Sequence, residues 1–326
     1  MGFGKKKETP VVTTYDGRVI RFKPDSWKED WKSNKILYLL FVPVAAWYII
    51  FHYIPMVGIL MAFENYNVRK GLFGSKWVGL DKFVELFTSE QFGLVMRNTC
   101  AMALLNLTVG FVAPILLALL ISQMKSKRFS RTVQTVSYMP YFVSAVVITS
   151  LASEFLSSTG AITVALSWFG FDKQNWLANP NVPVFWLINT FLEIWQGAGW
   201  GSIIYIAAIA NVNGNLHEAA AIDGANRWQR LWRVTLPTIL PLILMMFTLR
   251  IGMVFKTGFD KVLLLYIPKT YDVSDCLATF THRMAFGTTV DYGLSTASGL
   301  FQSVIGTILL ITTNKISRKT AGTSMF

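Results

Sequence analysis

The chain has 326 residues, of which 53% are hydrophobic, and its formal net charge is +12 at pH 7. Its mean hydropathy is positive, and the apolar residues fall in long blocks, each near the roughly 20 residues that a helix needs to cross a bilayer. These values exclude an ordinary soluble domain. Because Lys and Arg gather between the apolar blocks, the excess charge indicates a membrane surface rather than nucleic acid as the partner.

The N-terminal segment, residues 1–35, is polar and basic and does not have the pattern of a cleavable signal peptide. Trp27 and Trp31 lie four residues apart among charges, which predicts a short helix on the membrane surface within residues 26–35. An irregular linker is the alternative. The first apolar block, from Ile36 onward, is too long for the apolar core of a signal peptide, so we expect it to stay in the membrane.

Six blocks predict transmembrane helices, and together they predict an all-α membrane protein. Their predicted limits are residues 36–63, 101–121, 133–156, 184–210, 239–255 and 292–313. Residues 161–169 are too short to span and predict a short helix on the outer face. The last five spans would form a core at residues 95–315, followed by a C-terminal tail at residues 316–326.

The distribution of basic residues predicts the orientation, because Lys and Arg are enriched in cytoplasmic connections. They gather in the N-terminal tail, in the second-to-third and fourth-to-fifth connections, and in the C-terminal tail. By contrast, residues 157–183 contain a single basic residue, Lys173. With six spans the four basic segments lie on one side, so we expect both termini in the cytoplasm of a multi-pass protein of the cell membrane.

The connection between the predicted fourth and fifth spans has the pattern of two short helices. Asn215 with Glu218 predicts a capping box at the start of the first helix, and Asn226 with Gln229 predicts one at the start of the second. Gly224, between them, fits a C-terminal cap. We therefore expect the two helices to meet at a bend.

The same connection has features of a surface that docks onto another protein. The three Ala residues 219–221 favour helix and have little bulk, so a partner surface can approach them closely. Trp228, Leu231 and Trp232 are predicted to share one helix face. Pro237 is tolerated at the start of the fifth span because its missing N–H would be unpaired there. The pattern predicts a projection that fits a groove in a partner.

This segment resembles the EAA loop of binding-protein-dependent ABC importer permeases: Glu-Ala-Ala, three residues, Gly, nine residues, then Ile-x-Leu-Pro. Val234 stands where that pattern has Ile. In the family, the loop is a coupling helix that docks in a cleft of the ATPase subunit. The resemblance implies this role for Glu218, Ala219, Ala220, Asp223, Gly224, Leu236 and Pro237.

The resemblance covers nearly the whole chain, because residues 43–67, 77–87, 97–99 and 195–210 are similar to the carbohydrate-uptake branch, and above all to oligosaccharide permeases of the alginate-importer type. It implies a type I importer fold, a second related permease, an ATPase dimer that binds ATP and Mg, and an extracellular solute-binding lipoprotein. Residues 258–266 lack the Gly-Gly-Pro element of many disaccharide permeases, which argues against a maltose-like substrate.

No site for ATP, metal or another cofactor is expected in this chain, which we therefore do not expect to be an enzyme. Neither residues 2–7 nor residues 71–76 supply the phosphate-binding pattern of Gly, four residues, Gly-Lys and Ser or Thr. Cys100 and Cys276 have no metal-binding spacing, and the three His residues are scattered.

A polar stripe is predicted on the fourth span, where residues spaced by four, three and four share one helix face. Its members are Asn189, Glu193, Gln196 and Trp200. Hydrogen-bonding groups beside a flat aromatic ring suit a sugar, which makes the stripe a candidate translocation pathway. The alternative is helix packing, with Glu193 paired to a basic residue such as Arg250. Both interpretations stay open.

Two other functions are alternatives to carbohydrate import. An ABC permease for another solute, such as an amino acid or phosphate, would share the loop but not the similarity of the first and fourth spans. An ion-coupled secondary transporter predicts paired intramembrane carboxylates and an inverted repeat, and the sequence has neither pattern.

Overall fold

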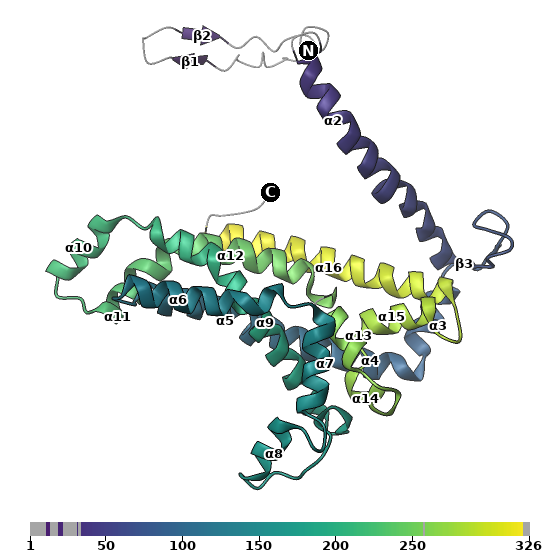
Figure 1. Ribbon diagram of the computed structural model, residues 1–326. Coiled ribbons are helices and arrows are strands. Elements are labelled where there is room, and N and C mark those ends of the chain that lie inside the picture. Colours follow the sequence, from purple (N-terminus) through teal and green to yellow (C-terminus); the bar gives the residue numbers. More distant parts are fainter. Residues whose placement is uncertain (1–10, 14–18, 22–30, 32–33, 257, 322–326) are drawn as a thin grey trace. The chain divides into compact units, whose positions relative to one another are not determined.

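The computed structural model describes residues 11–13, 19–21, 31, 34–256 and 258–321 (Figure 1). The chain divides into two units, residues 1–58 and 59–326. The first contains an antiparallel pair, β1 (Val11–Thr13) with β2 (Val19–Arg21), and then the helical segments α2 (Lys35–Tyr48), η1 (Ile49–Tyr53) and the beginning of η2 (Ile54–Phe63). Most of the surface helix predicted within residues 26–35 lies outside the described residues.

The second unit is almost entirely helical. After the end of η2 its elements are β3 (Glu64–Asn65), β4 (Lys76–Trp77), α3 (Asp81–Thr88), α4 (Glu90–Leu105), η3 (Asn106–Gly110), α5 (Phe111–Ser122), α6 (Lys127–Tyr138), η4 (Met139–Phe142), α7 (Ala145–Phe155), α8 (Ala161–Ser167), η5 (Trp176–Ala178), α9 (Val182–Ala210), α10 (Gly214–Ile222), α11 (Arg227–Arg230), η6 (Leu231–Thr235), α12 (Leu236–Gly252), η7 (Val254–Lys256), α13 (Phe259–Leu265), η8 (Pro268–Thr270), α14 (Tyr271–Ser274), α15 (Leu277–Phe286) and α16 (Tyr292–Ala321). The strands β3 and β4 pair antiparallel, with Glu64 opposite Trp77.

Four helices in the described part of the chain are long and apolar enough to cross a membrane: Lys35–Phe63, Glu90–Ser122, Arg227–Gly252 and Tyr292–Lys319. They correspond to the predicted first, second, fifth and sixth spans. The last helix was expected to end near residue 313, but it runs to Ala321 because residues 307–321 contain no Gly or Pro. The predicted tail at residues 316–326 is therefore helical in its first half.

The third span was predicted as one helix over residues 133–156, and this prediction is wrong. The chain bends by 95° between Lys127–Phe142 and Ala145–Phe155. The Ser144 side chain accepts a hydrogen bond from the N–H of Val147 at 3.3 Å, so it caps a new helix at that point. The bent pair counts as a fifth candidate span. The 29-residue α9 has nearly the limits predicted for the fourth span. Its polar and small residues lower its hydropathy, so it is not among the helices that are apolar enough to count as candidate spans. Six spans therefore stay a prediction.

The three π-helical turns in the described residues each precede a proline. They are η1 before Pro55, η3 before Pro114 and η6 before Pro237. Proline has no N–H for the carbonyl four residues earlier, and its ring crowds that carbonyl. A wider turn relieves this crowding without ending the helix, so each span continues through its proline.

Close backbone contacts position the long helices. Figure 1 shows α12 and α16 side by side, and a Cβ atom on Gly306 would lie 2.8 Å from the carbonyl oxygen of Gly252. A Cβ on Gly199 of α9 would lie 1.9 Å from the carbonyl oxygen of Ser137, so α6 also packs tightly. Since Gly252 ends α12 opposite the middle of α16, η7 and α15 pack along the remainder of α16.

The connection before α16 is fixed by an ion pair. Lys82 Nζ lies 2.7 Å from Asp291 Oδ2, and Asp291 Oδ1 accepts a hydrogen bond from the N–H of Leu294 at 2.8 Å, which caps α16. Burial lowers the pKa of Lys82, but hydrogen bonds to Asp291 and Glu85 outweigh this effect and raise the pKa above its ordinary value.

Candidate coupling loop and membrane polar cluster

The first helix of the loop, α10, has its N-cap two residues earlier than predicted. Its N-cap is Asn213, whose side chain accepts a hydrogen bond from the N–H of Asn215 at 3.0 Å. The predicted capping box of Asn215 and Glu218 is therefore wrong, because Glu218 is the fifth residue of the helix and lies beyond the position that reaches back to the cap. Glu218 and Ala219 are instead exposed.

The turn between α10 and α11 confirms the two other local predictions. Gly224 has a φ of +79°, and the N–H of Ala225 donates to the carbonyl of Ala220 at 2.9 Å, as in a Schellman motif. Asn226 and Gln229 form a reciprocal capping box, with distances of 2.8 and 2.9 Å. The bend is thus held by local hydrogen bonds at both of its ends.

The second helix of the loop is continuous with the following span. The segment from Arg227 to Gly252 runs through α11, η6 and α12 without interruption. Trp228 and Trp232 are exposed, whereas Leu231 is buried, so the two Trp rings face outward and Leu231 packs inward rather than sharing their face. Figure 1 shows α10 and α11 at the end of the unit where α12 begins.

The polar stripe on α9 meets a cation from an unexpected element. Glu193 Oε1 lies 2.5 Å from Nζ of Lys261 on α13, and the two side chains are 18% and 8% exposed. Arg250, the partner suggested from the sequence, instead donates from Nη2 to Asn106 Oδ1 at 3.0 Å. The difference arises because α12 ends beside the middle of α16, which lets α13 bring Lys261 to Glu193.

The other members of the stripe have different surroundings. Asn189 is 1% exposed, and its Nδ2 lies 3.8 Å from the Met102 sulfur. Gln196 Nε2 donates to the carbonyl of Val143 at 2.8 Å, next to the bend before α7. The ring of Trp200 stacks on Tyr141 at 4.7 Å and stays 44% exposed. All four members thus have contacts inside the chain, and Trp200 has the most open surface.

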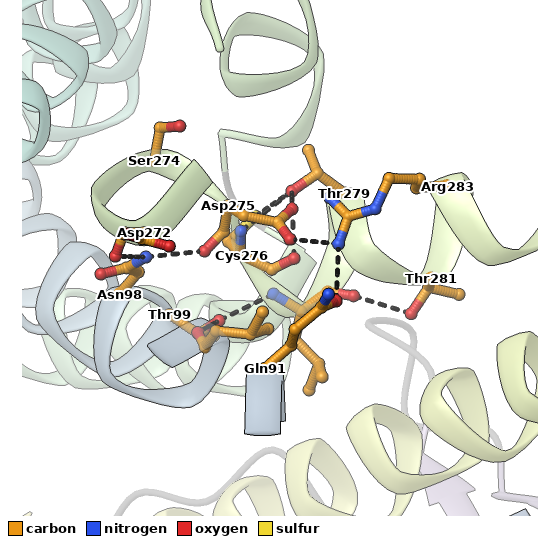
Figure 2. A network of polar contacts seen from close by, with 12 residues as sticks. Gln91, Asn98, Thr99, Asp272, Ser274, Asp275, Cys276, Thr279, Thr281 and Arg283 are labelled. Carbon is orange, nitrogen blue, oxygen red and sulfur yellow. Dashed lines mark hydrogen bonds and ion pairs between the residues drawn. The ribbon is translucent and has the colours of Figure 1, made fainter. Parts of the chain in front are cut away.

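A second polar network links α4 to the connection between α14 and α15 (Figure 2). Asn98 Nδ2 donates to the carbonyls of Asp272 and Asp275 at 3.1 and 2.9 Å. Thr99 Oγ1 accepts from the N–H of Leu277 at 2.8 Å, and Arg97 Nη2 donates to the Asp272 carbonyl at 2.6 Å. The three consecutive residues 97–99 therefore bind backbone that lies far along the chain.

The same network contains a buried ion pair that sequence reasoning missed. Arg283 Nη2 lies 2.7 Å from Asp275 Oδ2, and Thr279 Oγ1 donates to Asp275 Oδ1 at 2.7 Å. Gln91 Oε1 accepts a further, longer hydrogen bond from Arg283 at 3.3 Å. Figure 2 shows these side chains converging on the start of α15. Asp275 and Arg283 are eight residues apart, and no pattern in the sequence indicates that they form a pair.

Residues 110–318 match the family described as binding-protein-dependent transport system inner membrane component. The chain belongs to this family. The match covers the end of the α4–α5 span, the loop, the polar stripe and most of α16, whereas Gln91 and residues 97–99 of the second network precede it.

Curated relatives and solved structures agree with this membership. Protein LplB of Bacillus subtilis (strain 168) is 36% identical to this permease over 318 residues, which are 97% of this chain and 96% of LplB. The polygalacturonan/rhamnogalacturonan transport system permease protein YteP of the same organism is 37% identical over 290 residues, 88% of this chain and 89% of YteP.

The fold is that of a type I ABC importer permease. A chain in the crystal structure of a bacterial alginate ABC transporter, in complex with an alginate pentasaccharide-bound periplasmic protein, superposes with a TM-score of 0.84 at 38% identity. The superposition covers 92% of this permease and 100% of that chain. A chain of a second structure, of a bacterial ABC transporter involved in the import of the acidic polysaccharide alginate, gives 0.83 at 39% identity, with 90% and 99% covered.

Proposed function

We propose that this permease forms half of the membrane pathway through which an ATP-driven ABC importer takes up an oligosaccharide. The supporting observation is its similarity, over 92% of the chain, to a permease of the alginate transporter. Relatives named for other solutes are less similar: the sn-glycerol-3-phosphate permease UgpA and the osmoprotective-compound permease GgtC are each 28% identical, over 73% and 57% of this chain. A carbohydrate is therefore the better supported solute class.

The other half of the pathway comes from a second, related permease, and an extracellular binding lipoprotein delivers the sugar. ATP and Mg are bound by the ATPase dimer, so this chain contributes no catalytic residue. Alternating access arises when the two permeases rock around a site near the middle of the membrane. Glu193, Lys261 and Trp200 are this chain's candidates for lining that site.

The loop at residues 215–237 transmits the motion of the ATPase to the spans. Its exposed Glu218, Ala219 and Trp228 supply the docking surface, and the hydrogen-bonded turn at Gly224 keeps the angle between α10 and α11 constant. Because α11 continues into α12 as one helix, a displacement of the docked loop moves the span directly.

The membrane arrangement that goes with this role has six spans and cytoplasmic termini. In that arrangement the bent α6–α7 pair and α9 are the third and fourth spans, and the helices α13–α15 complete the outer half of the fifth. The core at residues 95–315 contains all of these elements except the first span.

The proposal is tested in proteoliposomes that contain the complete importer: both permeases and the ATPase. ATP hydrolysis is measured with the binding lipoprotein preloaded with an alginate or galacturonate oligosaccharide, with maltose, or with glycerol 3-phosphate. Stimulation by an oligosaccharide supports the proposal. Stimulation by glycerol 3-phosphate alone would overturn the solute class.

A further inference from the structure

A hollow of about 320 Å³ lies between the end of α5 and the loop. Ser122 and Lys125 line it from the end of the span, Ile209 from the end of α9, and His217 and Arg230 from the loop. Because the α4–α5 span ends at Ser122, the hollow sits where the hydrocarbon of the bilayer gives way to the lipid headgroups.

The charged residues that line this hollow are all basic. Lys125, Arg227 and Arg230 line it, and no acidic residue is among its described lining. No ion pair involving these three cations occurs between the described residues of the chain. In addition, the Nε atom of Arg230 is buried and has no hydrogen-bond partner within the described part.

The carbonyl end of α5 does not neutralise these cations. The N–H groups of Gln123 and Met124 donate to the carbonyls of Leu120 and Ile121, each at 3.1 Å, so these carbonyls of the last turn are already paired. His217 Nε2 lies 3.5 Å from Thr235 Oγ1, which keeps the imidazole against the wall of the hollow. The Ser122 hydroxyl already donates to the Leu119 carbonyl at 2.7 Å, so the charged donors of the hollow are the side chains of Lys125, Arg227 and Arg230, which are the kind that bind a phosphate group.

We propose that this hollow is a binding site for a phosphate-bearing anion, with Arg230 and Arg227 as the principal ligands and Lys125 as the third. Two sources have the required chemistry: the headgroup of an anionic phospholipid and free phosphate. The position at the end of a span favours the lipid, since basic pockets between transmembrane helices at the membrane surface bind anionic headgroups. An occupied site bridges α5 and the coupling loop, so the bound anion stabilises the loop against the spans. The inference rests on the fold and is independent of which solute is transported.

The test uses the full-length permease, purified with its assembly partners in a mild detergent. The midpoint of thermal unfolding is measured with dioctanoyl-phosphatidylglycerol, with dioctanoyl-phosphatidylcholine and with inorganic phosphate. A saturating anionic ligand is expected to raise the midpoint by roughly 3–6 °C, and the zwitterionic lipid is expected to have no comparable effect. A rise with phosphatidylglycerol alone identifies the lipid, and a rise with inorganic phosphate as well identifies the phosphate group itself.

The control variant separates the site from a general effect of charge. The double variant Arg227→Gln/Arg230→Gln is expected to lose the rise, whereas Arg128→Gln/Arg131→Gln on α6, with the same change in charge at exposed positions outside the hollow, is expected to retain it. If the double variant Arg227→Gln/Arg230→Gln does not assemble, Lys125→Gln is compared with Lys127→Gln. Lys125→Gln is then expected to reduce the rise in the midpoint. Absence of any rise in the wild type, or equal rises in site and control variants, would overturn the proposal.

Discussion

Arg283 on α15 and Asp275 form an ion pair with 2.7 Å between Nη2 and Oδ2, and their side chains are 19% and 3% exposed. Asp275 lies in the connection between α14 and α15, and its backbone carbonyl also accepts a hydrogen bond from Asn98 on α4. One residue therefore ties the start of α15 to α4 through its backbone and to Arg283 through its side chain (Figure 2).

Replacement of Asp275 by Asn is expected to destabilise the permease by about 3–5 kcal/mol, because it leaves the mostly buried Arg283 without a counter-charge. Thermal unfolding of the purified assembly measures the loss. Gln91→Ala is the control, since it removes only the longer 3.3 Å hydrogen bond to the same guanidinium and should cost about 1 kcal/mol or less. Equal losses in the two variants would show that the ion pair does not stabilise this connection.

The Glu193–Lys261 pair is expected to behave as a unit. Glu193→Gln leaves Lys261 as an unpaired cation that is only 8% exposed, so the amount of assembled complex should fall several-fold. The double variant Glu193→Gln/Lys261→Met removes both charges and should recover most of the yield. Quantitative immunoblotting of the membrane fraction, together with co-purification of the ATPase, measures assembly. A single variant as abundant as the wild type contradicts the prediction.

The turn at Gly224 is expected to be essential for coupling but not for insertion. A φ of +79° is inaccessible to proline, so Gly224→Pro should change the angle between α10 and α11 and abolish transport. Gly224→Ala has no steric clash at its Cβ and should cost about 1–2 kcal/mol from the left-handed backbone alone. Gly214→Ala, where φ is not positive and no atom lies within 4 Å of the added Cβ, should be neutral. Normal uptake by Gly224→Pro at wild-type abundance would show that this turn is not needed for coupling.

The six-span arrangement predicts which positions react with an impermeant thiol reagent in whole cells. Cysteines at Lys127 and Arg230 should be protected, and those at Gln174 and Lys269 should be labelled. The experiment needs a Cys100→Ala background, because Cys100 is exposed while Cys276 is buried. Labelling of Arg230→Cys from outside would contradict both the number of spans and the cytoplasmic position of the loop.

The sequence predicted features that depend on neighbouring residues. The capping box at Asn226, the C-terminal cap at Gly224 and the short helix α8 each follow from a few adjacent side chains, and the structure contains them. The prediction of the first cap was wrong because two candidate residues lie close together. Asn213 and Asn215 can both cap α10, and Asn213 does so. A hydropathy window also averages over the 95° bend, so it could not reveal that Ser144 starts a new helix.

Contacts between distant segments could not be predicted from a single sequence. The stripe on α9 indicated that Glu193 needs a cation, but the choice of Lys261 over Arg250 depends on where α12 ends. Similarly, Asn98 and Thr99 were noted only as part of a family resemblance. Their role in binding the connection before α15 becomes clear only when α4 and that connection lie together.

Trp200 is the residue of the stripe for which a pathway role and a packing role predict different results. Its ring stacks on Tyr141 with an angle of 5° between the planes, and Phe142 contacts its edge, yet 44% of the residue is exposed. Trp200→Ala should therefore leave the yield of the assembled importer nearly unchanged, since a half-exposed ring leaves no closed cavity. It should reduce oligosaccharide-stimulated ATP hydrolysis at least tenfold if the sugar stacks on the ring, and Trp200→Phe should restore part of that stimulation. Tyr141→Ala is the matched control, because it removes the stacking partner and keeps the Trp200 ring. If Trp200 only packs against Tyr141 and Phe142, Trp200→Ala should leave the stimulation per assembled complex normal.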